Sequence, residues 1–263
     1  MRPLHPRQTD ILDIAKREGR VDVDSLAEQF KVTPQTIRKD LNDLCGLDEL
    51  QRVHGGAVFP SSTSNFAYRS RRGLAIDAKS RIAAKIAQLI PNNSSLILNI
   101  GTTTEEVANA LRKHEGLMVI TNNLNVAFIL SDAPGVEVVV AGGMVRKTDG
   151  GIIGESAVDL IGQFKVDYAV VGASAIDEEG CLLDFDYREV RVAQAILRQA
   201  QTKILVADAM KFERRAPVRI GDLSDIDIFV TDEAPPGDIA EICASRDVEL
   251  IMARDESAQN QRR

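Results

Sequence analysis

The sequence predicts an α/β protein built from two parts of different size. In the first part, apolar residues with helical spacing recur three times before two short extended segments. In the larger second part, strand-like apolar runs alternate with helical segments, which is typical of a mostly parallel sheet covered by helices on both faces. We therefore expect a first domain over 1–58, a linker over 59–76, an α/β domain over 77–255 and a tail over 256–263.

The composition is that of a globular protein that buries a sizeable core. The chain has 263 residues, of which 44% are hydrophobic and 27% charged. Neither a signal peptide nor an apolar run of membrane-spanning length is visible. The three cysteines, Cys45, Cys181 and Cys243, are far apart and favour neither a disulfide framework nor a metal site. We expect a cytoplasmic protein with no metal, no other cofactor and no membrane partner.

The charge is distributed unevenly along the chain. The net charge is −7, but residues 1–72 hold 12 Lys and Arg against 10 Asp and Glu, whereas the remainder holds 20 against 29. This balance excludes a uniformly basic nucleic-acid coat protein. It is compatible with one DNA-binding domain, because binding needs only a local basic face.

Two short helices are predicted before the most informative segment. The first covers 8–18 and ends at Gly19. The second covers 26–30, with Asp24 or Ser25 as its N-cap.

A third helix is predicted to begin after Thr33, a good N-cap, with Pro34 in its first turn. Ile37, Leu41 and Leu44 form its buried stripe. The opposite face is polar, as a DNA-recognition helix requires, since such side chains hydrogen-bond to base edges. An ordinary solvated helix face is the alternative.

The extended segments after the third helix predict a β-hairpin wing, which completes a winged helix-turn-helix. Arg52 and His54 on this wing would meet the sugar-phosphate backbone. We interpret the arginines of the linker as groups that keep it solvated. Contact of these arginines with DNA is the alternative. The residues expected to contact DNA are Thr33, Gln35, Thr36, Arg38, Lys39, Asn42, Arg52 and His54.

The second part shows strand and helix patterns in alternation. Strands are predicted over 95–100, 117–121, 136–141, 166–172, 203–207 and 226–231, and helices over 78–90, 104–112, 125–130 and 189–200. Ligands of such sheets bind at the carboxyl ends of the strands.

Polar and glycine residues follow several of these strands. Gly101, Thr102, Thr103 and Thr104 connect one strand to a helix, where hydroxyls and free helix amides can hold a phosphate. An ordinary Thr-capped helix is the alternative. Four further strand ends carry Thr121 and Asn122, Gly142 and Gly143, Ser174, and Lys211, which together predict a polar crevice. Arg146 and Lys147 lie between two glycine pairs. We favour a plain surface loop here, and a basic loop that covers a phosphate is the alternative.

A family resemblance covers most of the chain. Residues 32–41 followed by 52–57 resemble the DNA-binding signature of the DeoR family of bacterial regulators. Residues 77–231 resemble the sensor domain of that family, which is related in fold to ribose-5-phosphate isomerase. The segments that carry this second resemblance are 101–103, 121–123, 141–143, 172–177 and 208–212.

Three segments, 121–127, 149–155 and 185–191, resemble a branch of the family that responds to glycerol 3-phosphate. The resemblance implies that this metabolite is the inducer. Asn99 and Ala173 differ from that branch, so a different sugar phosphate is the alternative.

The resemblance implies a repressor whose binding to operator DNA is relieved by a small phosphorylated metabolite, acting as a homodimer or homotetramer. The phosphate would bind at 101–104 with help from Lys211, and Asp184 and Glu189 would hold hydroxyls. Because acids and a lysine also suit sugar-phosphate isomerisation, an enzyme is one alternative. A DNA-organising protein without a ligand is another. We expect a regulator and not an enzyme, because the DNA-binding module favours sensing.

Overall fold

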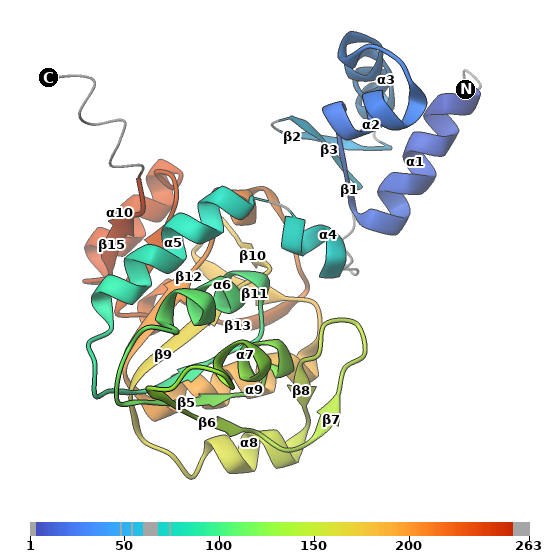
Figure 1. The fold of residues 1–263 in the computed structure, drawn as a ribbon. Coiled ribbons are helices and arrows are strands. Elements are labelled where there is room, and N and C mark those ends of the chain that lie inside the picture. The colour runs from blue at the N-terminus through green and yellow to red at the C-terminus, as the bar shows by residue number, and fades with distance from the viewer. Residues whose placement is uncertain (1–3, 48, 54, 60–67, 74, 255–263) are drawn as a thin grey trace, which may run out of the picture. The chain divides into compact units, whose positions relative to one another are not determined.

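The chain divides into two compact units, residues 1–74 and 75–263. The computed structural model describes residues 4–47, 49–53, 55–59, 68–73 and 75–254 (Figure 1). The predicted tail, 256–263, and the site candidate His54 lie outside the described residues.

The first unit is a three-helix cluster with a small antiparallel sheet. Its elements are α1 (Pro6–Glu18), β1 (Arg20–Asp22), α2 (Val23–Phe30), α3 (Pro34–Gly46), β2 (Gln51–Val53), β3 (Gly56–Val58) and α4 (Tyr68–Gly73). The strand order is β1-β3-β2. Strands β2 and β3 are the predicted wing. Helix α4 lies within the stretch predicted as a linker, so part of that stretch is helical.

Capping residues set where the helices begin. The Thr33 hydroxyl accepts a hydrogen bond from the backbone N–H of Thr36 at 3.3 Å, so α3 begins at Pro34 as predicted. Helix α2 begins earlier than predicted, because the Asp22 carboxylate accepts from the N–H groups of Asp24 and Ser25 at 2.9 and 3.1 Å. The prediction of Asp24 or Ser25 as N-cap was therefore wrong.

The core of the first unit fixes the orientation of α3. Its Ile37, Leu41 and Leu44 are fully buried against apolar residues of the other helices and of the small sheet. The wing is tightly packed at Gly56, where a Cβ would lie 2.0 Å from the carbonyl oxygen of Val21. The polar face of α3 is thereby directed away from the core.

The second unit is a three-layer α/β structure. Its helices are α5 (Ile76–Leu89), α6 (Thr102–Leu111), α7 (Leu124–Leu130), α8 (Glu155–Ile161), α9 (Tyr187–Gln199) and α10 (Gly237–Ser245), with 3-10 turns η1 (Ala209–Glu213) and η2 (Leu223–Asp225). Its strands are β4 (Ser95–Leu98), β5 (Leu117–Thr121), β6 (Val136–Val140), β7 (Met144–Val145), β8 (Ile152–Ile153), β9 (Val166–Gly172), β10 (Ala175–Ile176), β11 (Cys181–Asp184), β12 (Ala200–Val206), β13 (Val218–Asp222), β14 (Ile228–Thr231) and β15 (Glu249–Met252).

Seven strands form one parallel sheet in the order β15-β14-β12-β9-β4-β5-β6. Two smaller antiparallel sheets, β10-β11-β13 and β7-β8, accompany it. The main sheet confirms the predicted α/β class.

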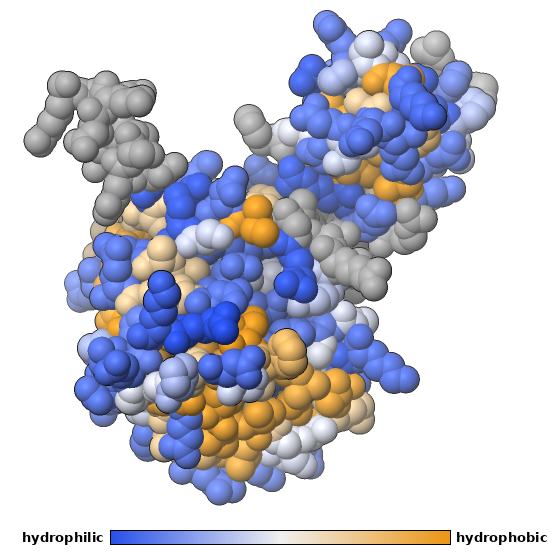
Figure 2. All heavy atoms as spheres, viewed as in Figure 1, coloured by the Kyte–Doolittle hydropathy of each residue, from blue (hydrophilic) through white to orange (hydrophobic). Residues whose placement is uncertain are grey.

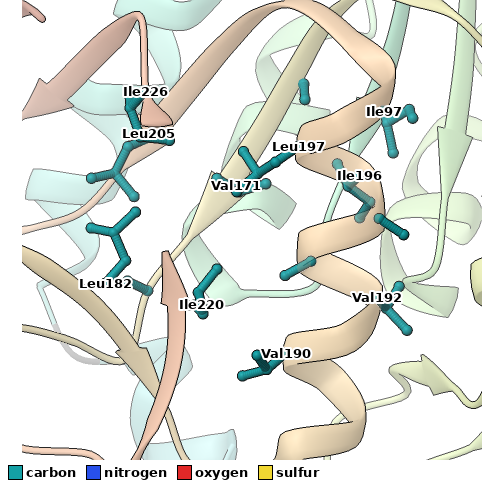
Figure 3. Packing of buried hydrophobic residues seen from close by; sticks show 14 of the residues in the cluster. Ile97, Val171, Leu182, Val190, Val192, Ile196, Leu197, Leu205, Ile220 and Ile226 are labelled. Carbon is teal, nitrogen blue, oxygen red and sulfur yellow. The ribbon is translucent and has the colours of Figure 1, made fainter. Parts of the chain in front are cut away.

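Side chains alternate between two cores on either face of this sheet. Ile97 of β4 lies in the cluster beneath α8, α9 and α10, whereas Leu96 and Leu98 lie in the cluster beneath α5, α6 and α7. Figure 3 shows Val192 and Ile196 of α9 in the first of these clusters. Within the part of the chain that the structure covers, each helix is too short or too polar to cross a bilayer.

Candidate functional site

The first candidate site is the polar face of α3. Gln35, Arg38, Lys39 and Asn42 are exposed and Thr36 is half-buried, so base-reading side chains face solvent along the helix. Arg38 brings a planar donor that pairs with guanine.

Two contacts between α1 and α3 hold this face in place. Asp40, which is buried on α3, accepts a hydrogen bond from Nε of Arg7 at 2.6 Å. Gln8 of α1 also donates to Asp43, at 3.2 Å. Arg52 is exposed on β2, in the wing, where it can meet a phosphate.

The second candidate site follows from the topology of the main sheet. From β4 the chain continues to β5 and β6 on one side, whereas β9, β12, β14 and β15 extend on the other side. The strand order therefore reverses between β4 and β9. Open parallel sheets bind ligands outside the carboxyl ends of the strands at such a reversal.

The segment after β4 turns directly into α6. Gly101 is its N-cap with φ 148° and ψ 152°, a conformation that suits glycine. The Thr104 hydroxyl donates internally, to the carbonyl oxygens of Asn99 at 2.7 Å and Gly101 at 2.8 Å. The hydroxyls of Thr102 and Thr103, with the first backbone amides of α6, are the groups left to hold an anion.

The segment after β5 is held by internal hydrogen bonds. The Thr121 hydroxyl donates to the Leu98 carbonyl oxygen at 2.7 Å and accepts from the Asn123 N–H at 3.0 Å. The Asn122 amide donates to the Ile152 carbonyl oxygen at 3.2 Å, while its Oδ1 is buried with no hydrogen-bond partner among the described residues. A ligand hydroxyl or a water molecule would supply the donor for this oxygen.

Three residues meet on the other side of the reversal point. The Ser174 hydroxyl, after β9, donates to Oδ2 of Asp184 at 2.8 Å. Glu189 lies in the first turn of α9, and its pKa responds to the charge of Asp184. All three side chains are buried.

Arg146, between β7 and β8, is the cation of this site. Its guanidinium donates to Asp149 at 2.7 Å, to Asp186 at 3.2 Å and to Glu189 at 2.6 Å. From the sequence we had favoured a plain surface loop at Arg146. The structure shows instead that Arg146 is paired with three carboxylates. Asp149 extends the network, because its carbonyl oxygen accepts from Asn125 at 2.9 Å.

The network continues to the first turn of α6. Asn125 also donates to Glu105 at 3.1 Å. A chain of polar contacts thus joins the segment after β4 to α9, across the point where the strand order reverses.

Burial and excess negative charge set the protonation of this cluster. Burial, with the charge of Asp184, raises the pKa of Glu189 to about 8, although Arg146 opposes this. Hydrogen bonds from Arg188 lower the pKa of Asp186 to about 2. Burial disfavours the charged form of Arg146. The negative charges of Glu189 and Asp149 outweigh this effect and raise the pKa of Arg146. Burial and the charge of Asp184 outweigh the effect of Arg146, so Glu189 keeps its proton at neutral pH.

The remaining candidates lie at the borders of the site. Gly142 and Gly143 are exposed beyond β6, and a Cβ on Gly143 would lie 2.8 Å from the Ile153 carbonyl oxygen. Lys211 is half-buried on η1, which packs against β10, just after Ser174.

Six members of the network were not among the predicted site residues: Glu105, Asn123, Asn125, Arg146, Asp149 and Asp186. The glycine pairs on either side of Arg146 were the signal that pointed to it. Asn123, Asn125 and Asp149 lie in segments that carry the family resemblance, but the sequence did not indicate their hydrogen bonds, which join segments that only the topology brings together.

A helix that exposes side chains of the types that pair with base edges, joined in one chain to an α/β unit whose polar side chains gather where the strand order reverses, defines a ligand-responsive transcription regulator. The DeoR-like helix-turn-helix domain matches residues 7–63, and the DeoR C terminal sensor domain matches residues 74–233. The chain belongs to the DeoR family and is a DNA-binding transcriptional repressor.

Similar proteins cover almost the whole chain. The glycerol-3-phosphate regulon repressor of Escherichia coli K12 is 43% identical over 94% of this chain and 98% of its own length. The protein of that name from Haemophilus influenzae is 46% identical over 88% and 90%. The transcriptional repressor CsqR of E. coli K12 is 36% identical over 96% and 97%.

Among solved structures, similarity is found to ribose 5-phosphate isomerase A from Methanocaldococcus jannaschii. The TM-score is 0.39 with 14% identity, over 52% of this chain and 55% of the isomerase.

Proposed function

We propose that this repressor releases its operator when a small phosphorylated metabolite binds, and that glycerol 3-phosphate is that metabolite. The observation that carries the proposal is the 43–46% identity, over nearly the whole chain, to proteins named for the glycerol-3-phosphate regulon. A different sugar phosphate is the alternative within the same class.

The polar groups at the strand-order reversal, which we call the proposed crevice, are complementary to the two ends of such a ligand. The phosphate would bind the first amides of α6 and the hydroxyls of Thr102 and Thr103, with Lys211 as cation. The polyol hydroxyls would bind Asp184 and protonated Glu189, which together accept and donate. The carboxylates around Arg146 repel a phosphate, so they favour this orientation over the reverse one.

Release follows from linkage. The ligand binds more tightly to a form of the oligomer in which the recognition helices do not match the operator half-sites. By reciprocity, it then lowers operator affinity by the same factor.

The ligand half of the proposal is tested by Thr102→Val combined with Thr103→Val. These substitutions keep shape and remove hydroxyls, so the variant should bind operator normally and lose its response to glycerol 3-phosphate. Thr202→Val, at the amino-terminal end of β12, is the matched control. Titration of the operator complex with a panel of phosphorylated polyols and sugars is the readout. Normal release in the double variant would disprove the phosphate position.

The DNA half is tested by Arg38→Ala. Loss of one base contact costs about 1–3 kcal/mol, so operator affinity should fall roughly 10- to 100-fold and sequence discrimination should relax. Lys113→Ala, which removes an exposed charge from the other unit, is the control. Unchanged specificity in the Arg38 variant would contradict the assignment of α3.

An enzyme is the second candidate, because the pKa of Glu189 near 8 suits a general acid or base. Conversion of a pentose or triose phosphate by the purified protein would establish it. We propose the sensor alone, since the polar groups also suit simple binding.

A further inference from the structure

We propose that two copies of this chain associate through one apolar face of the α/β unit, formed by α7, β6 and β7. This face consists of Leu124, Phe128, Val140, Met144 and Val145, and we call it the α7–β7 face. The inference rests on the proposed function in one respect: a two-fold operator requires an even number of recognition helices.

The α7–β7 face concentrates exposed apolar surface. Phe128 is 80% exposed and Met144 is 65% exposed. Among the described residues, ten large apolar side chains are exposed, and five of them belong to this short stretch of sequence. Figure 2 shows apolar surface gathered over the region of α7, β6 and β7.

The five side chains come from segments that are tied to one another. Leu124 and Phe128 are four residues apart on α7, so they share a face of that helix. The N–H of Leu124 donates to the Gly150 carbonyl oxygen at 3.1 Å, which ties the segment between β7 and β8 to α7. Val140 is the last residue of β6 and pairs with Thr121, the last residue of β5. The chain continues from β5 into α7.

The α7–β7 face includes an edge strand, β6, whose composition is unusual for the edge of a sheet. It is a terminal strand of the seven-stranded sheet, and four of its five residues are valine. Natural edge strands are generally protected by lysine, proline or a bulge. Glu137 is the single charge on β6, so this edge has little protection unless another surface covers it.

The net negative charge of the unit restricts where a second copy can bind. Residues 75–263 hold 20 basic and 29 acidic side chains, so two such units repel each other over most of their surfaces. The α7–β7 face brings no charge of its own into a contact.

Its size also fits. The exposed side chains offer on the order of 400 Å² of apolar surface, about half of the ~800 Å² that each partner buries in a stable interface. A polar rim supplies the remainder. A contact of this face with itself has two-fold symmetry.

The test compares a variant that places two charges on the α7–β7 face with a control variant that places two charges at other exposed apolar positions. The test variant is Phe128→Glu with Met144→Glu. The control variant is Tyr187→Glu with Met252→Glu, which adds the same charge to exposed apolar positions on α9 and on the opposite edge strand, β15. Molar mass is measured by sedimentation equilibrium, and circular dichroism melting verifies that each full-length variant is folded.

We expect wild-type protein and the control variant to have a multiple of the 28.7 kDa chain mass, and the test variant to dissociate at least ~100-fold more readily. Hydrogen exchange should be slower in β6 and α7 of the wild type than of the test variant. A monomeric wild type, or a folded test variant of unchanged mass, would overturn the proposal. Loss of association without any wild-type response to glycerol 3-phosphate would instead refute the proposed inducer and leave this interface standing.

Discussion

Substitution of Glu189 by glutamine should remove a specific pH dependence of stability. In the folded protein the pKa of Glu189 is about 8, against an ordinary value of 4.5. Between these values the unfolded chain has released a proton that the folded chain retains. The raised pKa therefore stabilises the fold fully below pH 4.5, and this contribution is lost as pH rises through 8.

The magnitude follows from the two pKa values. Each pH unit in this interval lowers the free energy of unfolding by about 1.4 kcal/mol, so the whole interval has an upper bound of roughly 5 kcal/mol. The glutamine side chain in the Glu189→Gln variant cannot ionise, and its amide oxygen can still accept from Arg146. The variant should therefore be more stable than wild type near pH 8 and similar to it near pH 5.

The assay is urea unfolding of the α/β unit, followed by circular dichroism at a series of pH values. Glu241→Gln, on the exposed side of α10, controls for the loss of a carboxylate. The lowered pKa of Asp186, about 2, affects stability only in more acidic solution, so it does not interfere. Parallel pH profiles for wild type and the Glu189 variant would refute the burial argument.

Three further substitutions test the packing of each unit. Thr33→Ala removes the N-cap of α3 and should cost the first unit about 1 kcal/mol, measured by thermal unfolding; no change would show that the cap is dispensable. Gly56→Ala places a Cβ against Val21 and should abolish operator binding while calorimetry still detects ligand binding; normal operator affinity would show that the wing adjusts. Phe229→Ala, fully buried beside Phe212, should destabilise the α/β unit by about 3–5 kcal/mol in urea, and a loss below about 1 kcal/mol would mean that the core closes around the cavity.

Local pattern was sufficient for much of the fold. The Thr33 cap and the buried stripe of α3 were readable because both signals lie within one turn or one helix. Six of the seven strands of the main sheet were readable as apolar runs, whereas the edge strand β15 was not predicted. The two-residue strands β7, β8 and β10 were not, because so short a segment has no periodicity, and its pairing depends on distant partners.

The candidate site divides in the same way. The Gly101–Thr104 turn was visible because a strand, a glycine and a helix start are adjacent in sequence. Contacts such as that of Arg146 with Glu189 span 43 residues, so they depend on where β9 and α9 place each segment. Sequence suggested Glu189, but not that the guanidinium of Arg146 would be shared between Glu189, Asp149 and Asp186.

That shared guanidinium has a consequence for ligand choice. Arg146 is already engaged by Asp149, Asp186 and Glu189, and Arg188 is engaged by Asp186, so both arginines at the hydroxyl end of the proposed crevice are paired with carboxylates before a second phosphate could bind. A sugar bisphosphate would bring its additional anion into a carboxylate-rich wall. On the proposed orientation the crevice accepts compounds phosphorylated at one end and rejects those phosphorylated at both, so a doubly phosphorylated sugar at the same concentration would leave the operator occupied.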